Sequence, residues 1–152
     1  MRLTKRFIIK SLDNIPISQP IKYERYYINN SLRIQKRENC YEKEILTENN
    51  TLKQKEQISQ EEFLKLKETA FKKIIRESYL YLKDDRVSIK KYYGDYTGLY
   101  RVEVKFLSKE EMKNYVKETW MGKEITLSPL AFDKDLSKLT PEEFLIELKK
   151  FL

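Results

Sequence analysis

The segment Tyr92-Tyr93-Gly94-Asp95-Tyr96-Thr97-Gly98-Leu99-Tyr100-Arg101-Val102-Glu103-Val104-Lys105-Phe106 contains two of the three glycines of the chain, and the third lies downstream in Trp120-Met121-Gly122-Lys123-Glu124-Ile125-Thr126. The first glycines indicate a turn, and the residues after it alternate in character as a strand would. One face of this strand carries Arg101, Glu103 and Lys105, and the opposite face carries Tyr100, Val102, Val104 and Phe106. The charged face either meets solvent or lines a polar cavity.

The length and composition of the chain predict one folded unit over residues 1–152. A chain of 152 residues is long enough for one core, and 40% of it is hydrophobic, with eleven tyrosines and seven phenylalanines that suit strands. The formal net charge is +7 and the pI is about 9.3. This charge favours polyanionic partners, although a lysine-rich solvent-facing surface gives the same numbers.

The residue types that are missing restrict the possible chemistry. Cys40 is the only cysteine and the chain has no histidine, so intrachain disulfides, Cys/His zinc sites and histidine relays are excluded. Any chemistry must use carboxylates, lysines, arginines, tyrosines or a carboxylate-bound metal. No apolar run has the roughly 20 residues that cross a bilayer, and residues 1–10 do not resemble a signal peptide. We therefore expect a cytoplasmic protein with no membrane partner.

The pattern of β-branched, aromatic and turn residues predicts an α+β fold in which strands dominate. Helices are expected after Ser59, near 109–118 and at 141–151, each behind a capping box. The predicted strands cover 3–9, 20–28, 31–37, 41–47, 51–58, 72–83, 86–92 and 99–106. Because the links are short, we expect about eight antiparallel strands in a closed or nearly closed barrel, with helices packed outside.

The segments quoted above resemble the closing half of the CYTH, or triphosphate tunnel metalloenzyme, superfamily, which includes class IV adenylate cyclases and thiamine triphosphatases. In that family an aromatic and acidic glycine turn and a Gly-Leu pair lead into a strand reading Glu-Val-Glu, and a Trp-Leu-Gly-x-Glu-Val-Thr segment follows. The resemblance is strong over residues 92–126 and weaker over the rest of the chain. It implies a tunnel whose wall includes the charged face of the strand 99–106.

The matching positions of this chain have lost most of the family's carboxylates. The family's first-strand Glu-x-Glu-x-Lys matches Arg2, Thr4 and Arg6, its Arg-x-Arg matches Arg33 and Gln35, and its glutamates before the first long helix match Lys53 and Lys55. Its Lys-x-Arg matches Arg76 and Ser78, its Glu-x-Asp matches Ser88 and Lys90, and its final Glu-x-Glu matches Glu103 and Lys105. The resemblance therefore implies a degenerate member of the family, in which cations replace most metal ligands.

The replaced positions define the candidate site. Since Mg²⁺ and Mn²⁺ need several oxygen ligands, Glu103 alone is a poor metal site, and we expect no metal and no cofactor. Lysine and arginine can neutralise phosphate oxygens directly. The candidate phosphate-binding residues are Arg6, Arg33, Lys53, Lys55, Arg76, Lys90, Arg101 and Lys105. The strand register is left open, because a slip of one residue at 51–58 would turn Gln54 and Glu56 inward in place of Lys53 and Lys55. The alignment of the neighbouring strand, which carries Glu42 and Glu44, is open as well.

Three functions remain open from the sequence. The favoured hypothesis is a pseudoenzyme, a protein that binds a nucleotide, nucleoside triphosphate or polyphosphate without metal. The second is an active Mg²⁺- or Mn²⁺-dependent triphosphatase, tripolyphosphatase or adenylate cyclase, with Glu103 as its catalytic carboxylate. The third is a module that binds nucleic acid or an acidic protein, which we favour less because no nucleic-acid-binding motif accompanies the basic residues. The protein is expected to be a monomer or a homodimer.

Overall fold

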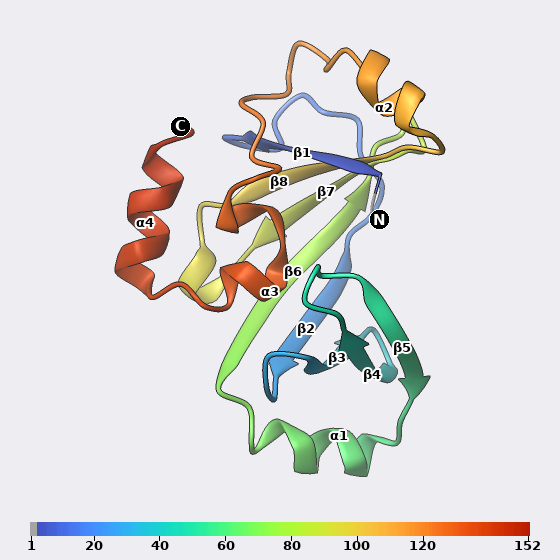
Figure 1. The fold of residues 1–152 in the computed structure, drawn as a ribbon, viewed down its shortest axis with the longest axis vertical. Coiled ribbons are helices and arrows are strands. Elements are labelled where there is room, and N and C mark those ends of the chain that lie inside the picture. The colour runs from blue at the N-terminus through green and yellow to red at the C-terminus, as the bar shows by residue number, and fades with distance from the viewer. Residues whose placement is uncertain (1–2) are drawn as a thin grey trace.

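Eight strands form one antiparallel sheet in the order β1-β8-β7-β6-β2-β3-β4-β5 in the computed structural model, which describes residues 3–152 (Figure 1). The strands are β1 (Thr4–Ile9), β2 (Ile21–Tyr27), β3 (Leu32–Arg37), β4 (Cys40–Leu46), β5 (Leu52–Gln57), β6 (Lys72–Leu80), β7 (Val87–Tyr92) and β8 (Tyr100–Lys105). Each predicted strand is present with ends close to those predicted. The antiparallel α+β fold is confirmed.

The sheet curls but is not closed by hydrogen bonds within residues 3–152, where β1 and β5 are its two edges. The edge of β1 is covered by the segment that contains Gly122. The amide of Gly122 donates to the carbonyl of Ile8 (2.8 Å), and the amide of Ile8 donates to the carbonyl of Lys123 (3.0 Å). A Cβ on Gly122 would lie 2.3 Å from the Ile8 carbonyl oxygen, so only glycine permits this approach.

The longer helices begin directly after the capping residues that the sequence predicted. The helices are α1 (Gln60–Lys67), α2 (Lys109–Asn114), α3 (Asp133–Leu136) and α4 (Pro141–Lys149), with short 3₁₀ turns at Gly94–Tyr96 and Pro129–Ala131. The side chains of Ser59, Ser108 and Thr140 each accept a hydrogen bond from the backbone amide three residues later. The helix predicted at 109–118 ends early, because Tyr115 is extended and packs its ring against Phe106. Within residues 3–152, no helix is both long and apolar enough to span a membrane.

The two faces of the sheet pack differently. On the outer face of β1, β7 and β8, Phe7, Val102 and Val104 are buried in one apolar cluster, against which Met112 of α2 and Trp120 pack. On the inner face, α4 contributes Phe144 and Leu148 to a second apolar cluster. That second cluster fills only one end of the inner face, because the charged residues of the same strands occupy the rest. The helix α3 lies against this inner side of the sheet, unlike the outside position expected for the helices (Figure 1).

Candidate functional site

Five strands of the inner face change from apolar to basic over two residues. In each case a buried apolar or tyrosine side chain of the inner cluster lies two positions from a cation, on the same face of the sheet. These pairs are Ile8 and Arg6 in β1, Tyr27 and Arg25 in β2, Ile74 and Arg76 in β6, Tyr92 and Lys90 in β7, and Leu99, just before β8, with Arg101 in β8. The apolar cluster thus forms a floor, and basic side chains from five strands lie next to it.

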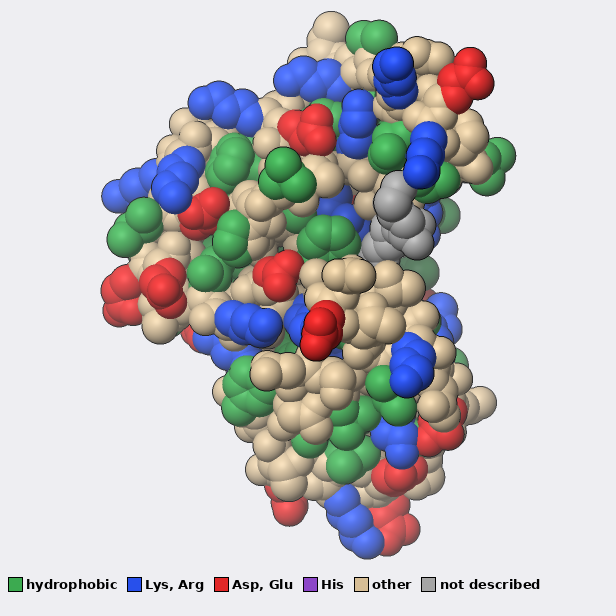
Figure 2. Space-filling model, in the orientation of Figure 1, with side chains coloured by type: hydrophobic (Ala, Val, Ile, Leu, Met, Phe, Trp, Pro, Cys, Tyr) green, Lys and Arg blue, Asp and Glu red, His purple; other side chains and the backbone are tan. Residues whose placement is uncertain are grey.

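These side chains line a pocket of about 530 Å³. Eight basic and two acidic side chains of the described residues border it. The basic ones are Arg6, Arg25, Arg33, Arg76, Lys90, Arg101, Lys105 and Lys134, and the acidic ones are Glu103 and Asp133. The charged face of β8 therefore lines a cavity, as the tunnel interpretation of its alternation predicted. On the molecular face in Figure 2, by contrast, acidic and basic side chains are interspersed.

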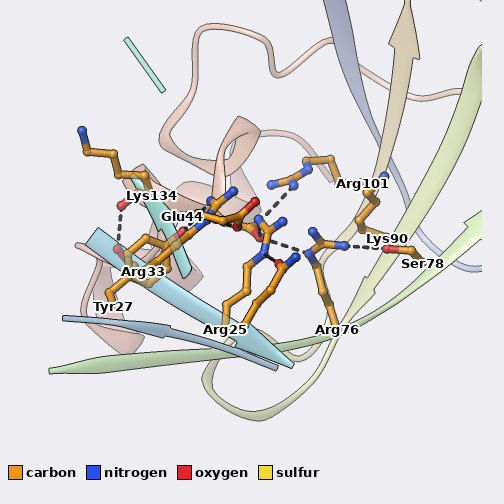
Figure 3. A network of polar contacts seen from close by, with 12 residues as sticks. Arg25, Tyr27, Arg33, Glu44, Arg76, Ser78, Lys90, Arg101 and Lys134 are labelled. Carbon is orange, nitrogen blue, oxygen red and sulfur yellow. Dashed lines mark hydrogen bonds and ion pairs between the residues drawn. The ribbon is translucent and has the colours of Figure 1, made fainter. Parts of the chain in front are cut away.

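One end of the pocket is organised around the carboxylate of Asp133. Its Oδ2 lies 2.8 Å from Nη1 of Arg25 and 3.0 Å from Nε of Arg76, and its Oδ1 lies 3.0 Å from Nη2 of Arg101. Tyr92 also donates its hydroxyl to Oδ1. Figure 3 shows the three guanidinium groups pointing toward one another from different strands. Burial alone would raise the pKa of Asp133, but the three arginines outweigh it and hold the pKa well below the ordinary value.

The other carboxylate of the pocket, Glu103, is also surrounded by cations. Its Oε2 lies 3.2 Å from Nη2 of Arg6 and 3.9 Å from Nζ of Lys90. Burial opposes ionisation of Glu103, yet the charges of Lys90, Arg6, Arg101 and Lys105 together lower its pKa strongly. Glu103 is therefore ionised at neutral pH and already neutralised by the protein.

Lys90 is the pocket cation whose charge is most easily lost. Its ammonium group donates to the hydroxyl of Ser88 at 2.6 Å, and only 13% of its side chain is exposed. The pKa of Lys90 is lowered to about 7, mainly by burial and also by the positive charges of Arg76, Arg101 and Lys105, against the opposing effect of Glu103. An anion entering the pocket would favour the protonated form, because it offsets these repulsions.

A third buried ion pair lies between β3 and β4. Nε of Arg33 is 2.8 Å from Oε1 of Glu44, and Nη1 of Arg33 donates to the hydroxyl of Tyr27 at 3.2 Å. Burial would raise the pKa of Glu44, but Arg33 and the neighbouring Arg25 lower it overall. Beside this pair, Gln35 donates to Glu42 at 2.8 Å.

The structure brings together six of the eight predicted phosphate-binding residues as pocket-lining side chains. These are Arg6, Arg33, Arg76, Lys90, Arg101 and Lys105. The other two, Lys53 and Lys55, do not line the pocket. Lys53 is exposed, and Lys55 extends to Glu42 at 3.2 Å on the β4 surface. The register does turn Lys55 to the same side as Glu42 and Glu44, whereas Glu56 pairs with Lys43. Arg2 lies outside the described residues.

Some residues of the site were missed by the sequence prediction. Arg25, Asp133 and Lys134 line the pocket, and neither the segment around Asp133 nor the position of Arg25 was predicted to matter. The buried acidic side chains among the described residues are Glu42, Glu44, Glu103 and Asp133, and not Glu103 alone. The alternation of Tyr23, Arg25 and Tyr27 along β2 was the signal that could have identified Arg25.

The acidic residues do not form a site that suits Mg²⁺ or Mn²⁺. In the part of the chain that the structure describes, no group of three or more acidic or cysteine side chains is placed to hold a metal ion. Glu103 is bound by Arg6, and Glu44 is bound by Arg33. Hard divalent ions require several free oxygen ligands, so this arrangement does not fit the metal that the family resemblance implies.

Comparison with solved structures supports the fold. Two crystal structures match nearly the whole chain at 17% identity. One, described as the hypothetical protein NE1496, gives a TM-score of 0.74 over 93% of this chain and 100% of the other. The second, described as the inorganic triphosphatase NE1496, gives 0.72 over 91% and 98%. A scan of protein families and a search of curated proteins find no match. The chain therefore shares the fold of these two structures, which agrees with the fold that the sequence resemblance implied.

Proposed function

We propose that this chain, which has the triphosphate tunnel fold, binds a phosphorylated anion in the pocket and neutralises its phosphates with arginine and lysine instead of a metal ion. The observation that carries the proposal is the composition of the pocket, in which eight basic side chains face two acidic ones. Because both acidic side chains are already paired with cations of the protein, the remaining positive charge is available to a ligand. Nucleoside triphosphates and inorganic polyphosphates carry the matching charge.

The electrostatics of the empty pocket favour anion binding. Two like charges about 4 Å apart repel by about 4 kcal/mol at an effective dielectric constant near 20. Arg76, Arg101 and Lys105 all disfavour the charged form of Lys90, which is evidence of this repulsion. An anion would relieve it, so a bound polyphosphate should raise the melting temperature as well as bind tightly.

Lys105 is the best residue for a first test of the pocket. It lines the pocket from the end of β8 and is exposed, so its replacement leaves no buried charge uncompensated. Lys53 offers a matched control, because it is also an exposed strand lysine but does not line the pocket. We expect Lys105→Gln to weaken binding about ten-fold, the effect of removing one hydrogen bond to a charged group. Lys53→Gln should bind like the wild type.

The experiment measures tripolyphosphate and ATP binding by calorimetry in EDTA and in Mg²⁺, with phosphate release followed in parallel. Binding in EDTA without phosphate release, weakened by Lys105→Gln and not by Lys53→Gln, would support the proposal. Failure of both compounds to bind in EDTA would refute it. An equal loss in the two variants would indicate a general effect of net charge, not of the pocket.

The structural match to a protein described as an inorganic triphosphatase favours a second candidate, a metal-dependent triphosphatase. For this function the acidic residues would have to exchange their arginine and lysine partners for metal. Phosphate release from tripolyphosphate that requires Mg²⁺ or Mn²⁺ and is lost in Glu103→Gln would establish this function in place of the first.

A further inference from the structure

The cluster of three arginines around Asp133 is built largely without the help of Asp133. Arg25, Arg76 and Arg101 come from β2, β6 and β8. Arg76 lies over the ring of Tyr23, 4.5 Å from its centroid, and Arg101 lies 5.2 Å from the centroid of Tyr92. Nη1 of Arg76 also donates to Ser78 at 2.5 Å. Arg76 and Arg101 are therefore positioned by contacts in addition to those with Asp133.

The carboxylate of Asp133 brings less negative charge than the three arginines can neutralise. Asp133 brings one negative charge to three guanidinium groups, and each of them gives it a single nitrogen contact of 2.8–3.0 Å. Guanidinium groups can bind two oxygens of one anion side by side, a mode that these single contacts do not use. A phosphoryl group brings up to two negative charges and three oxygens, so it matches the cluster better than a carboxylate does.

Asp133 lies on a short element that is held to the far side of the pocket by polar contacts. Lys134 donates to the carbonyl of Thr47 at 3.1 Å, and Asn50 donates to Asp135 at 3.1 Å. The buried Leu130 precedes the four-residue helix α3 and the buried Leu136 is its last residue, so the segment is anchored in the apolar floor on both sides of Asp133. For the carboxylate to leave the arginines, the first turn of α3 must therefore move while Leu130 and Leu136 stay in place.

We propose that Arg25, Arg76 and Arg101 form a phosphoryl subsite and that Asp133 is an internal anion that competes with the ligand for it. This inference rests on the proposed function, because it concerns the same pocket. Asp133 keeps the empty pocket neutral enough to fold and lowers its affinity for weak anions. Only a ligand with more negative charge and more oxygens than the carboxylate can displace Asp133 and bind these three arginines.

The test is the affinity of Asp133→Asn for tripolyphosphate, measured by calorimetry in EDTA. The matched control is Asp135→Asn, which removes the same charge from the same helix at a residue whose carboxylate contacts Asn50. We expect Asp133→Asn to bind tripolyphosphate at least ten-fold more tightly than the wild type, and Asp135→Asn to stay within two-fold. Acetate should compete poorly for Asp133→Asn compared with inorganic phosphate. Equal or weaker tripolyphosphate binding by Asp133→Asn would overturn the proposal.

A second measurement needs no variant and decides the question if Asp133→Asn does not fold. The amides of Leu136 and Ser137 donate to the carbonyls of Phe132 and Asp133. If tripolyphosphate displaces Asp133, hydrogen exchange of these two amides should speed up at saturating ligand. Unchanged or slower exchange with ligand bound would refute the competition. If the wild type binds no tripolyphosphate at all, the proposed function itself fails. If it binds tripolyphosphate without tighter binding by Asp133→Asn and without faster amide exchange, only the role of Asp133 is refuted.

Discussion

Arg6 and Glu103 lie directly opposite each other in the pairing of β1 with β8, and Nη2 of Arg6 is 3.2 Å from Oε2 of Glu103. The sequence resemblance matches Glu103 to a carboxylate of the family and Arg6 to the lysine of its first-strand motif, and the structure pairs these two side chains. The negative charge of Glu103 is thus neutralised by cations of the chain itself. This pairing explains how β8 can keep its glutamate and still line a pocket bordered mostly by basic side chains.

The first prediction concerns Glu103→Gln. Removing this charge should tighten tripolyphosphate binding about ten-fold, because a negative charge several ångströms from the ligand repels it by about 1–2 kcal/mol at an effective dielectric constant near 20. Calorimetry in EDTA measures the change, and the isosteric side chain keeps the packing. Weaker binding by this variant would show that Glu103 assists the ligand instead of opposing it.

The second prediction concerns pH and Lys90, whose pKa falls to about 7 in the folded protein from an ordinary value of 10.5. Between these values the unfolded chain binds a proton that the folded protein does not, so the free energy of unfolding of the unliganded protein should rise with pH across this window. Lys90→Met should remove this dependence and stabilise the protein below pH 7, by about 1–4 kcal/mol.

Urea unfolding at pH 6 to 10 checks this, with Lys73→Met as the control, because Lys73 is exposed on β6. The wild type and the control should share the same slope of stability against pH. If Lys90→Met keeps that slope as well, Lys90 is not the group that causes it.

The third prediction concerns the buried ion pair of Arg33 and Glu44. Arg33→Met leaves the carboxylate of Glu44 buried without its main partner, which should cost about 3–5 kcal/mol. The double variant Arg33→Met, Glu44→Met should recover most of this loss, since it leaves neither charge behind. Denaturant unfolding of the two single variants and the double variant gives the coupling energy. Additive losses would mean that the two side chains do not depend on each other.

The fourth prediction concerns Gly122→Ala. The added methyl group would lie 2.3 Å from the carbonyl oxygen of Ile8, so the segment that covers β1 must move away and lose its hydrogen bonds. We expect a loss of about 2–4 kcal/mol, at the upper end of the effects of single substitutions. Gly94→Ala is the comparison, because Gly94 has a φ of 65° but no neighbouring atom within 4 Å of where its methyl group would lie, and its cost should be about 1 kcal/mol. Thermal unfolding ranks the two, and a smaller effect at Gly122 would contradict the packing argument.

The sequence predicted the strands well because their signals are local. Gly94 and Gly98 have φ values of 65° and 104°, which other residues adopt only with strain, and they fix where β8 begins. Once that start is known, alternation alone places Arg101, Glu103 and Lys105 on one face. The same reasoning placed Lys90, because β7 leads directly into the same turn.

The residues that were missed depend on contacts between distant parts of the chain. Asp133 lies in a segment without periodicity, and its role arises only where β2, β6 and β8 meet. Lys53 was misplaced for a related reason, since the β4–β5 register shifts between Ile45 and Leu46. Alternation in one strand cannot reveal a bulge in the ladder that pairs it with another.

The pairing of β1 with β8 also has a consequence for synthesis of the protein on the ribosome. Thr4 pairs with Lys105, so β1 is made well before the strand with which it pairs. At about 5–20 residues per second, the apolar residues Phe7, Ile8 and Ile9 stay without their sheet partner for roughly 5–20 s. The strands from β2 to β6 can pair with one another during that interval. Until β8 has been made, the apolar residues of β1 are therefore exposed to aggregation.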